Sequence, residues 1–216
     1  MWPESTETQE LLAQAQAGDA AAVNNLLDRH RDALRRMVDL RMDRALSQRV
    51  DASDIVQDTL VEANRRLRDY LANPAMPFHL WLRHMARDRL IDAHRRHRVA
   101  ERRSLDREQS LTAPPNLDHS TMELAAQLYD SELTPAAAAT WHELQRRFQA
   151  AIETLDEHDR EIVLMRHFEQ MSNQDVAAAL DLSEAAASMR YLRAMRRLRT
   201  MLAEPADETD QGRADE

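Results

Sequence analysis

Arginine is the side chain with which this sequence could bind a charged partner, because it is concentrated in two stretches. Between Arg190 and Arg199 there are five arginines and no acidic residue. Between Arg83 and Arg103 there are eight arginines against three acidic residues. The whole chain has a net charge of -9, so two basic clusters within it predict two surfaces that bind a polyanion. The alternative is that each cluster is an ordinary solvated helix surface.

Histidine is the other residue type that could support chemistry, but its placement argues against a catalytic or metal site. His94 and His97 lie among arginines, which disfavours a metal cation, and His142-Glu143 lacks the second histidine of a zinc-protease motif. There is no cysteine, and with only two glycines the chain has no glycine-rich phosphate loop. We therefore expect no catalytic residue, no metal and no cofactor, and a binding protein in place of an enzyme.

The elements that must position the arginines are predicted to be helices. Abundant alanine, leucine, arginine and glutamate, two glycines, 4% aromatic residues and no sustained alternation of apolar residues indicate an all-α protein. Residues 104–160 hold eleven acidic residues against four arginines. We expect two helical domains, 1–102 and 135–203, joined by a flexible acidic linker over 103–134, with a disordered acidic tail at 204–216.

Residues 155–202 contain three helical runs, each preceded by a start signal. Asp156, Ser172 and Ser183 each offer a side-chain oxygen to an unpaired amide at a helix start. The second run is short, the third is long, and only Asp181 to Ser183 separates them. Two helices joined by so tight a turn indicate a helix-turn-helix, the arrangement that places a recognition helix in the DNA major groove.

The third run has two distinct faces. Residues at three- and four-residue spacing predict a buried stripe of Ala187, Tyr191, Ala194, Leu198, Met201 and Leu202. The opposite face carries Glu184, Ser188, Met189, Leu192, Arg193, Arg196 and Arg197. This second face is the one that we expect to meet DNA.

An earlier helix, from Asp51 to about Leu71, carries a line of acidic and polar residues beside its apolar stripe. The line is mostly acidic and comprises Asp54, Gln57, Asp58 and Val61. One interpretation is that acidic groups complement the helix dipole in the first turn. The other is that the line is a docking face for a basic partner helix.

A rigid break at Asn73 to Pro77 leads into a basic helix that begins at about Phe78. Along this helix Arg83, Arg87, His94 and Arg95 are expected to point away from the buried face, and Arg96 and Arg98 extend its positive end. Arginines that follow a constrained loop suit single-stranded nucleic acid, whose phosphates they can contact. An ordinary amphipathic helix is the alternative.

Three sequence blocks together resemble the extracytoplasmic-function class of bacterial RNA polymerase sigma factors. The blocks are DASDIVQDTLVEA, FHLWLRHMARDRLIDAHRRHR and LDEHDREIVLMRHFEQMSNQDVAAALDLSEAAASMRYLRAMRRLR. They look like the helix that docks on core polymerase, the helix that recognises the minus-ten element and the domain that reads the minus-thirty-five element. The resemblance spans about Glu10 to Leu202.

The resemblance implies the partners core RNA polymerase and promoter DNA, and it allows an anti-sigma factor as a third. It places the polymerase contacts at Asp54, Gln57 and Asp58. It places the minus-ten contacts at Asn73, Met76, Arg83, Arg87, Arg95, Arg96 and Arg98. It places the minus-thirty-five contacts at Glu184, Ser188, Met189, Arg190, Leu192, Arg193, Arg196 and Arg197, with Leu192 meeting a thymine methyl group and Arg193 a guanine edge or a phosphate.

The sequence departs from the family at three positions. Asp181 stands where a turn glycine is usual, which is tolerable because aspartate can adopt the left-handed conformation. Residues Ala185 to Met189 carry fewer hydrogen-bonding side chains than is usual before the recognition arginine, and Asp88 replaces a common asparagine. The code by which the third run reads bases is therefore open.

The sequence also predicts where the protein is located, and it leaves one rival function open. No segment has the pattern of a signal peptide or a membrane span, so we expect a cytoplasmic protein that does not bind a membrane. The rival is a conventional helix-turn-helix repressor or activator. It would explain the C-terminal block but would leave the acidic line and the first basic cluster without a role.

Overall fold

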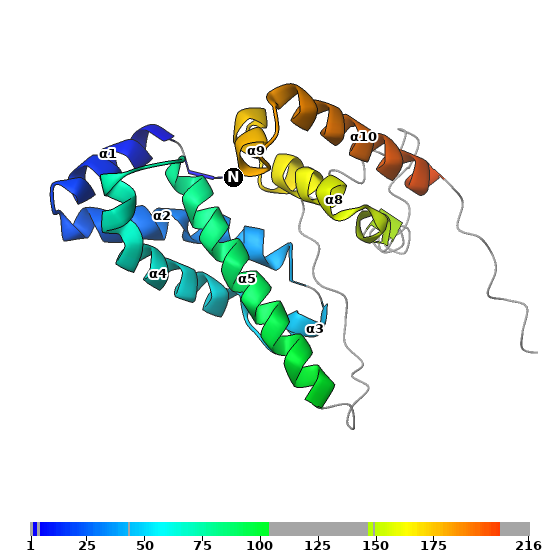
Figure 1. Cartoon of the computed structure of the whole chain (residues 1–216), viewed down its shortest axis with the longest axis horizontal. Coiled ribbons are helices and arrows are strands. Elements are labelled where there is room, and N and C mark those ends of the chain that lie inside the picture. Colours follow the sequence, from blue (N-terminus) through cyan, green and yellow to red (C-terminus); the bar gives the residue numbers. More distant parts are fainter. Residues whose placement is uncertain (1, 4, 43, 104–146, 149, 204–216) are drawn as a thin grey trace, which may run out of the picture. The chain divides into compact units, whose positions relative to one another are not determined.

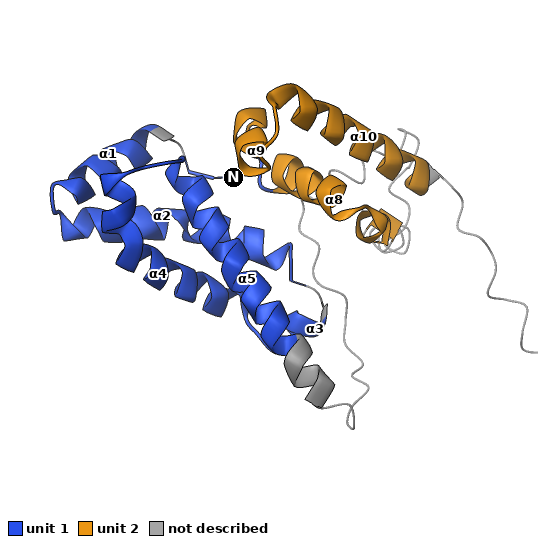
Figure 2. Ribbon diagram, in the orientation of Figure 1, with its two compact units in different colours: residues 1–115, 169–171 blue, residues 116–168, 172–216 orange. Residues whose placement is uncertain are grey.

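The computed structural model describes residues 2–3, 5–42, 44–103, 147–148 and 150–203. These residues form helices and contain no strand (Figure 1). Contacts divide the chain into a first unit, residues 1–115 with 169–171, and a second unit, residues 116–168 with 172–216 (Figure 2). The expectation of an all-α chain with two helical domains is confirmed.

Two expected segments fall largely outside the described residues. The linker predicted at 103–134 is described only at Arg103, where a helix ends, and the tail predicted at 204–216 is not described. Before Leu155, the domain expected at 135–203 is described only at residues 147–148 and 150–154, which are helical.

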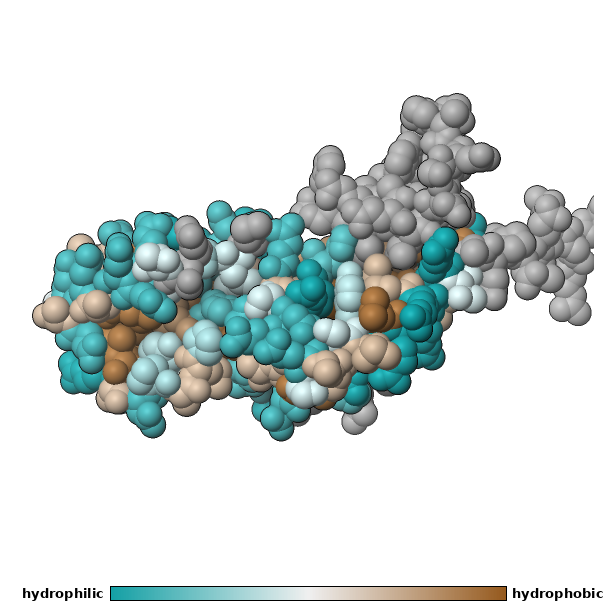
Figure 3. Space-filling model, turned by 90° about the horizontal axis from the view of Figure 1, so that it is seen from above, coloured by the Kyte–Doolittle hydropathy of each residue, from teal (hydrophilic) through white to brown (hydrophobic). Residues whose placement is uncertain are grey.

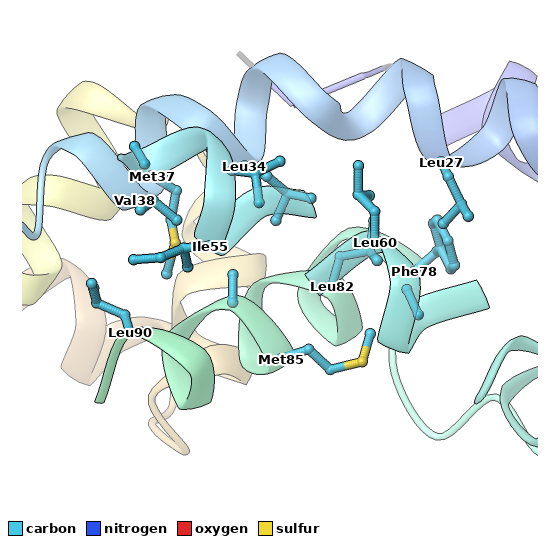
Figure 4. Close-up of a cluster of buried hydrophobic side chains, with 14 of the residues drawn as sticks. Leu27, Leu34, Met37, Val38, Ile55, Leu60, Phe78, Leu82, Met85 and Leu90 are labelled. Carbon is cyan, nitrogen blue, oxygen red and sulfur yellow. The ribbon is translucent and has the colours of Figure 1, made fainter. Parts of the chain in front are cut away.

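The core of the first unit lies where three of its helices meet. Its helices are α1 (Ser5–Gln16), α2 (Ala20–Asp39), α3 (Arg44–Ser47), α4 (Ala52–Ala72) and α5 (Phe78–Arg103). Helix α2 packs against α1, α4 and α5, and α4 packs against α5. Figure 4 shows Leu34 of α2, Leu60 of α4 and Leu82 of α5 among the apolar side chains that converge there. Burying one such side chain contributes roughly 1.5–3 kcal/mol.

The starts of α2 and α4 are each set by an aspartate side chain that bonds to nearby backbone amides. Asp19 accepts hydrogen bonds from the amides of Ala21 and Ala22, at 2.8 and 3.2 Å. Asp51 accepts one from the amide of Ser53 at 2.7 Å and so begins α4. These bonds satisfy backbone N–H groups that would otherwise be unpaired at the starts of α2 and α4.

His30 is a polar residue inside the first unit and gives its stability a pH dependence. Its side chain is fully buried, its Nδ1 donates to the Leu26 carbonyl at 2.8 Å, and its Nε2 has no hydrogen-bond partner. Its ring meets Phe78 edge-on, with the ring centres 5.1 Å apart. Burial lowers the pKa of His30 from 6.5 to about 4.

We expect the first unit to lose stability on acidification between pH 6.5 and about 4. In that window the unfolded state binds a proton at His30 that the folded state does not, and the loss sums to roughly 3 kcal/mol. Urea unfolding at several pH values would measure it, with Trp141→Phe as background so that Trp2 and Trp81 of the first unit report. The control is His30→Met in the same background. An equal loss of stability in both proteins would contradict the assignment.

The second unit contains the predicted helix-turn-helix. After helical residues 150–154 it continues through α8 (Glu157–Val163), the π-helical turn η1 (Leu164–Phe168), α9 (Asn173–Ala179) and α10 (Glu184–Ala203). Helix α10 packs on α8 and on α9. The three predicted start signals are confirmed: the side chains of Asp156, Ser172 and Ser183 accept hydrogen bonds from the amides of Asp159, Asp175 and Ala186.

The turn between α9 and α10 depends on a left-handed residue. The amide of Leu182 donates to the carbonyl of Ala177 at 2.9 Å, which closes the end of α9. This bond requires Asp181 to adopt a positive φ, and its φ is 53°. The expectation that Asp181 serves in place of a turn glycine is confirmed.

Replacing Asp181 by valine should therefore destabilise the helix-turn-helix by about 1–3 kcal/mol, because a β-branched residue is strained at positive φ. Asp181→Asn is the matched control, since asparagine adopts this conformation readily. Amide hydrogen exchange of α9 and α10 in the full chain would report the change. Equal protection in the two variants would show that the turn does not need the left-handed residue.

Candidate nucleic-acid interface

Helix α10 is held by one apolar face, and this fixes which face is left for a partner. Ala187, Ala194, Leu198 and Leu202 of the predicted stripe are buried, while Tyr191 and Met201 are half-buried. The start of α10 is tied to α9 by the side-chain amide of Asn173, which donates to the carbonyl of Glu184 at 2.9 Å. Packing and this bond together orient the opposite face of α10 outward.

That opposite face is exposed as predicted. The exposed residues are Glu184, Ser188, Met189, Leu192, Arg193, Arg196 and Arg197, and Arg190 is half-exposed. Within the part of the chain that the structure describes, the side chains of Arg190, Arg193 and Arg196 form no ion pair. Their charges are available to an anionic partner.

Arg197 differs from the other arginines of this face because it is already paired. Its Nη1 lies 3.1 Å from a carboxylate oxygen of Asp156 and 3.1 Å from one of Asp159. The hydrogen bonds that Arg197 donates to Asp159 and Asp156 raise the pKa of its guanidinium group. The pKa of Asp156 is lowered, first by the hydrogen bond from the Asp159 amide and then by Arg197. Arg197 therefore links α10 to the start of α8.

The same residues border a hollow on the second unit. It is lined by Asp156, His158, Asp159, Arg190, Arg193 and Arg197. Asp156 and Asp159 both pair with Arg197. The positive charges that remain uncompensated in this hollow therefore belong to Arg190 and Arg193.

The arginines of α5 also differ from one another in exposure and in their partners. Arg95 and Arg96 are exposed, and Arg87 is half-buried. Arg95 lies 3.3 Å from a carboxylate oxygen of Asp92, and the Nε of Arg96 donates to the Asp92 carbonyl at 3.3 Å. The side chain of Arg98 lies outside what the structure describes. The exposed cationic groups of α5 thus lie toward its C-terminal half.

Arg83 corrects an expectation, because it is buried and does not point away from the core. Its side chain is 1% exposed, and its Nε lies 3.1 Å from a carboxylate oxygen of Glu169, a residue that groups with the first unit. Burial alone would raise the pKa of Glu169, but the guanidinium groups of Arg41 and Arg83 outweigh it and lower that pKa. In this structure Arg83 is not available to DNA.

The loop between α4 and α5 is pinned by an aromatic residue. The hydroxyl of Tyr70 donates to the carbonyl of Met76 at 2.9 Å, and its ring stacks on Trp81 with the ring centres 4.6 Å apart. Asn73 is exposed and its amide ends α4, while Met76 is half-buried. The loop therefore has a fixed base and exposes polar backbone around Asn73.

The acidic line of α4 is exposed along its whole length. Asp54, Gln57 and Asp58 are all exposed, and Val61, one turn further, is 41% exposed. Gln57 accepts a long hydrogen bond, 3.4 Å, from Arg31. Asp54 and Asp58 form no ion pair with any described residue. Asp58 lies beyond the first turn of α4, where the helix dipole no longer explains an acidic residue.

Some positioning residues could not be recognised in the sequence. Asp156 is visible there only as a helix cap, and its contact with Arg197 spans 41 residues. The contact of Tyr70 with Met76 crosses a loop whose conformation the prolines restrict but do not define. A signal for Arg83 does exist: Leu80, Arg83, Ala86 and Leu90 recur at three- and four-residue spacing, and all four are buried.

Two further observations bear on function. Among the described residues, no three His, Cys, Asp or Glu side chains are grouped so that they could hold a metal ion. No helix in the described ranges is both long enough and apolar enough to cross a membrane.

Comparison with known proteins assigns both units. Residues 24–99 match the family model described as Sigma-70 region 2, and residues 145–198 match Sigma-70, region 4. The chain is 30% identical over 193 residues to RNA polymerase sigma factor CnrH of Cupriavidus metallidurans, covering 89% of this chain and 92% of that protein.

Solved structures agree with this assignment. The structure of CnrH in complex with the cytosolic domain of CnrY is 25% identical, covers 91% of this chain and 97% of that one, and superposes with a TM-score of 0.55. The pair of sigma regions, the relative over almost the full length and the shared fold give one conclusion. The chain belongs to the extracytoplasmic-function class of bacterial RNA polymerase sigma factors, which direct core polymerase to specific promoters.

Proposed function

We propose that this sigma factor divides promoter recognition between two domains, residues 1–102 and 135–203. The first would bind core polymerase and the minus-ten element, and the second would bind the minus-thirty-five element, with residues 103–134 as the linker and 204–216 as a tail. The matched regions, 24–99 and 145–198, fall inside the two domains and support this division. The factor acts by binding, and no step of bond chemistry is assigned to it.

The polymerase contact is assigned to the exposed acidic line of α4. Asp54 and Asp58 have no ion-pair partner among the described residues, and Gln57 lies between them. Two uncompensated carboxylates on one helix face complement a basic helix of a partner. Val61, exposed beside them, adds apolar surface to that face.

The minus-ten contact is assigned to the loop that follows α4 and to four arginines of α5. Asn73 and Met76 would border the pocket for an unstacked base, and Arg87, Arg95, Arg96 and Arg98 would contact phosphates of the melted strand. The bond from Tyr70 to Met76 supports this role because it holds the loop in one conformation. Arg83 is withdrawn from the set because it is buried.

The minus-thirty-five contact is assigned to the exposed face of α10, and the unpaired Arg190, Arg193 and Arg196 carry the proposal. These arginines lie on the second helix of a helix-turn-helix, whose exposed face enters the major groove in this motif. Arg197 would act differently, by holding α10 against Asp156 and Asp159.

A protein that restrains the factor is the third partner that we propose. The solved structure of CnrH contains the cytosolic domain of CnrY, so a relative of this chain is held by another protein. We propose an anti-sigma factor of that kind for this chain, and the cytoplasm, where the polymerase acts, as the compartment of both.

Run-off transcription with core polymerase on a library of genomic fragments tests the proposed function and yields the promoter. The expected result is initiation at a small set of start sites that depends on the added factor. Tight, sequence-specific DNA binding in the absence of polymerase, with no transcript when polymerase is added, would favour the conventional repressor or activator.

A further inference from the structure

The exposed face of α10 carries large apolar side chains that the fold does not require. Among the described residues the large exposed apolar side chains are Val61, Ile91, Met189 and Leu192. Met189 is 54% exposed and Leu192 is 47% exposed, and they lie three residues apart on α10. Hydrophilic residues cover most of the described surface that faces the viewer in Figure 3, with smaller apolar patches between them.

Met189 and Leu192 belong to a strip that begins one turn earlier. Ala185, four residues before Met189, is also exposed. Residues three and four apart are neighbours on a helix surface, so Ala185, Met189 and Leu192 form one apolar strip. Ala187 and Ala194, which pack α10 against its own unit, are buried on the other face. The strip is therefore free for a partner.

The surroundings of the strip indicate the charge of that partner. Ser188, Arg193 and Arg196 are exposed on the same face, and neither arginine has an ion-pair partner in the described part of the chain. The partner must offer apolar groups bordered by negative charge. The major groove of DNA offers both, because the 5-methyl group of thymine projects between two lines of phosphates.

The position and length of the strip also fit the major groove. It occupies the N-terminal half of the second helix of a helix-turn-helix, the part that contacts base edges in this motif. From Ala185 to Leu192 it extends on the order of 10 Å along the helix axis. That length corresponds to about three base-pair steps of roughly 3.4 Å each.

We propose that Met189 reads a thymine methyl group beside the one expected for Leu192 in the minus-thirty-five element, and that apolar contact by the whole strip replaces hydrogen bonding over this part of the site. This inference rests on the proposed function of α10 as the reader of that element. It explains how a recognition helix with alanines at 185–187 can still be selective, because methyl groups distinguish thymine from every other base in the major groove.

The test removes methyl groups from DNA and side-chain atoms from the protein in parallel. Full-length factor with core polymerase is first used to select duplex promoters that are randomised in the minus-thirty-five element. Each thymine of the selected element is then replaced by uracil, which lacks only the methyl group, and binding of the holoenzyme is measured by competition. The variants are Met189→Ala and Leu192→Ala, and Ile91→Ala, which truncates an equally exposed side chain on α5, is the matched control.

The expected result is a loss of about fourfold in affinity for each contacted methyl group with the unchanged factor. Met189→Ala should abolish the effect of uracil at one position and Leu192→Ala at another, while Ile91→Ala keeps both effects. If uracil has no effect although transcription still depends on the minus-thirty-five element, the inference is wrong and the proposed function stands. If transcription is independent of that element, the role of α10 and the inference both fall. If both variants keep full sensitivity to uracil but lose binding to a protein partner, the strip binds protein and the inference is wrong.

Discussion

Replacing Asp54 and Asp58 together by arginine is expected to lower the affinity of the factor for core polymerase by about a hundredfold or more. Both carboxylates are exposed on α4 and lack ion pairs among the described residues, so their charge is free for a partner. Losing two charge-assisted contacts at an interface and adding two repulsive charges costs several kcal/mol, and about 1.4 kcal/mol corresponds to a factor of ten. Competition for core polymerase against a labelled sigma factor measures the affinity.

The control for this experiment keeps the same change of charge on the same unit. Glu10 on α1 and Asp69 near the end of α4 are also exposed, and Glu10→Arg with Asp69→Arg changes the net charge equally. This control should retain polymerase binding to within a few-fold. If the two double variants bind equally well, α4 does not dock through Asp54 and Asp58. A fall of equal size in both would indicate a general electrostatic effect, which high salt would weaken.

Local signals explain why so much of the fold could be predicted from the sequence. Helix starts depend on one side chain and the next few amides, so Asp19, Asp51, Asp156, Ser172 and Ser183 were identifiable without tertiary information. The buried faces follow from three- and four-residue spacing in the same way.

The errors and omissions concern polar side chains whose partners are distant in the sequence. A charge on an apolar face could not be assigned from spacing alone, and the prediction that Arg83 points outward was wrong because Glu169, 86 residues away, pairs with it. Arg197 was correctly predicted to be exposed, but its two carboxylate partners were not foreseen. Tertiary structure decides whether a charged side chain is buried or ion-paired. The residue types alone do not specify this outcome.

Whether an arginine forms an ion pair indicates its role better than the number of arginines on the helix does. The arginine cluster of α10 looked uniform in the sequence, yet Arg197 is held by two carboxylates, whereas Arg190, Arg193 and Arg196 form no ion pair with any described residue. A paired arginine must break its contacts before it can bind a phosphate, whereas an unpaired one loses only hydration and side-chain freedom. The unpaired residues are therefore the better candidates for reading DNA, and this ranking can be tested on one helix.

Arg193→Ala is expected to weaken recognition of the minus-thirty-five element by about ten- to a hundredfold, and Arg197→Ala to weaken it much less. Arg193 is exposed, forms no ion pair with a described residue and lies on the face of α10 that we propose to meet DNA, and one good arginine contact with a base is worth about 1–3 kcal/mol. Arg197 makes exposed ion pairs, which contribute little to stability. Holoenzyme transcription from the selected promoter, compared with the same promoter carrying a scrambled upstream element, isolates this contribution.

The outcome also distinguishes base reading from phosphate binding, because the two contacts respond differently to sequence and salt. If Arg193 reads a base, Arg193→Ala should reduce the difference between the intact and the scrambled promoter. A phosphate contact, which we expect for Arg196, should instead weaken binding to both templates alike and lower the slope of log affinity against log salt by about 1. Should Arg197→Ala prove more damaging than Arg193→Ala, the anchoring of α10 to Asp156 and Asp159 would matter more than its free arginines. The assignment of roles by pairing would then be wrong.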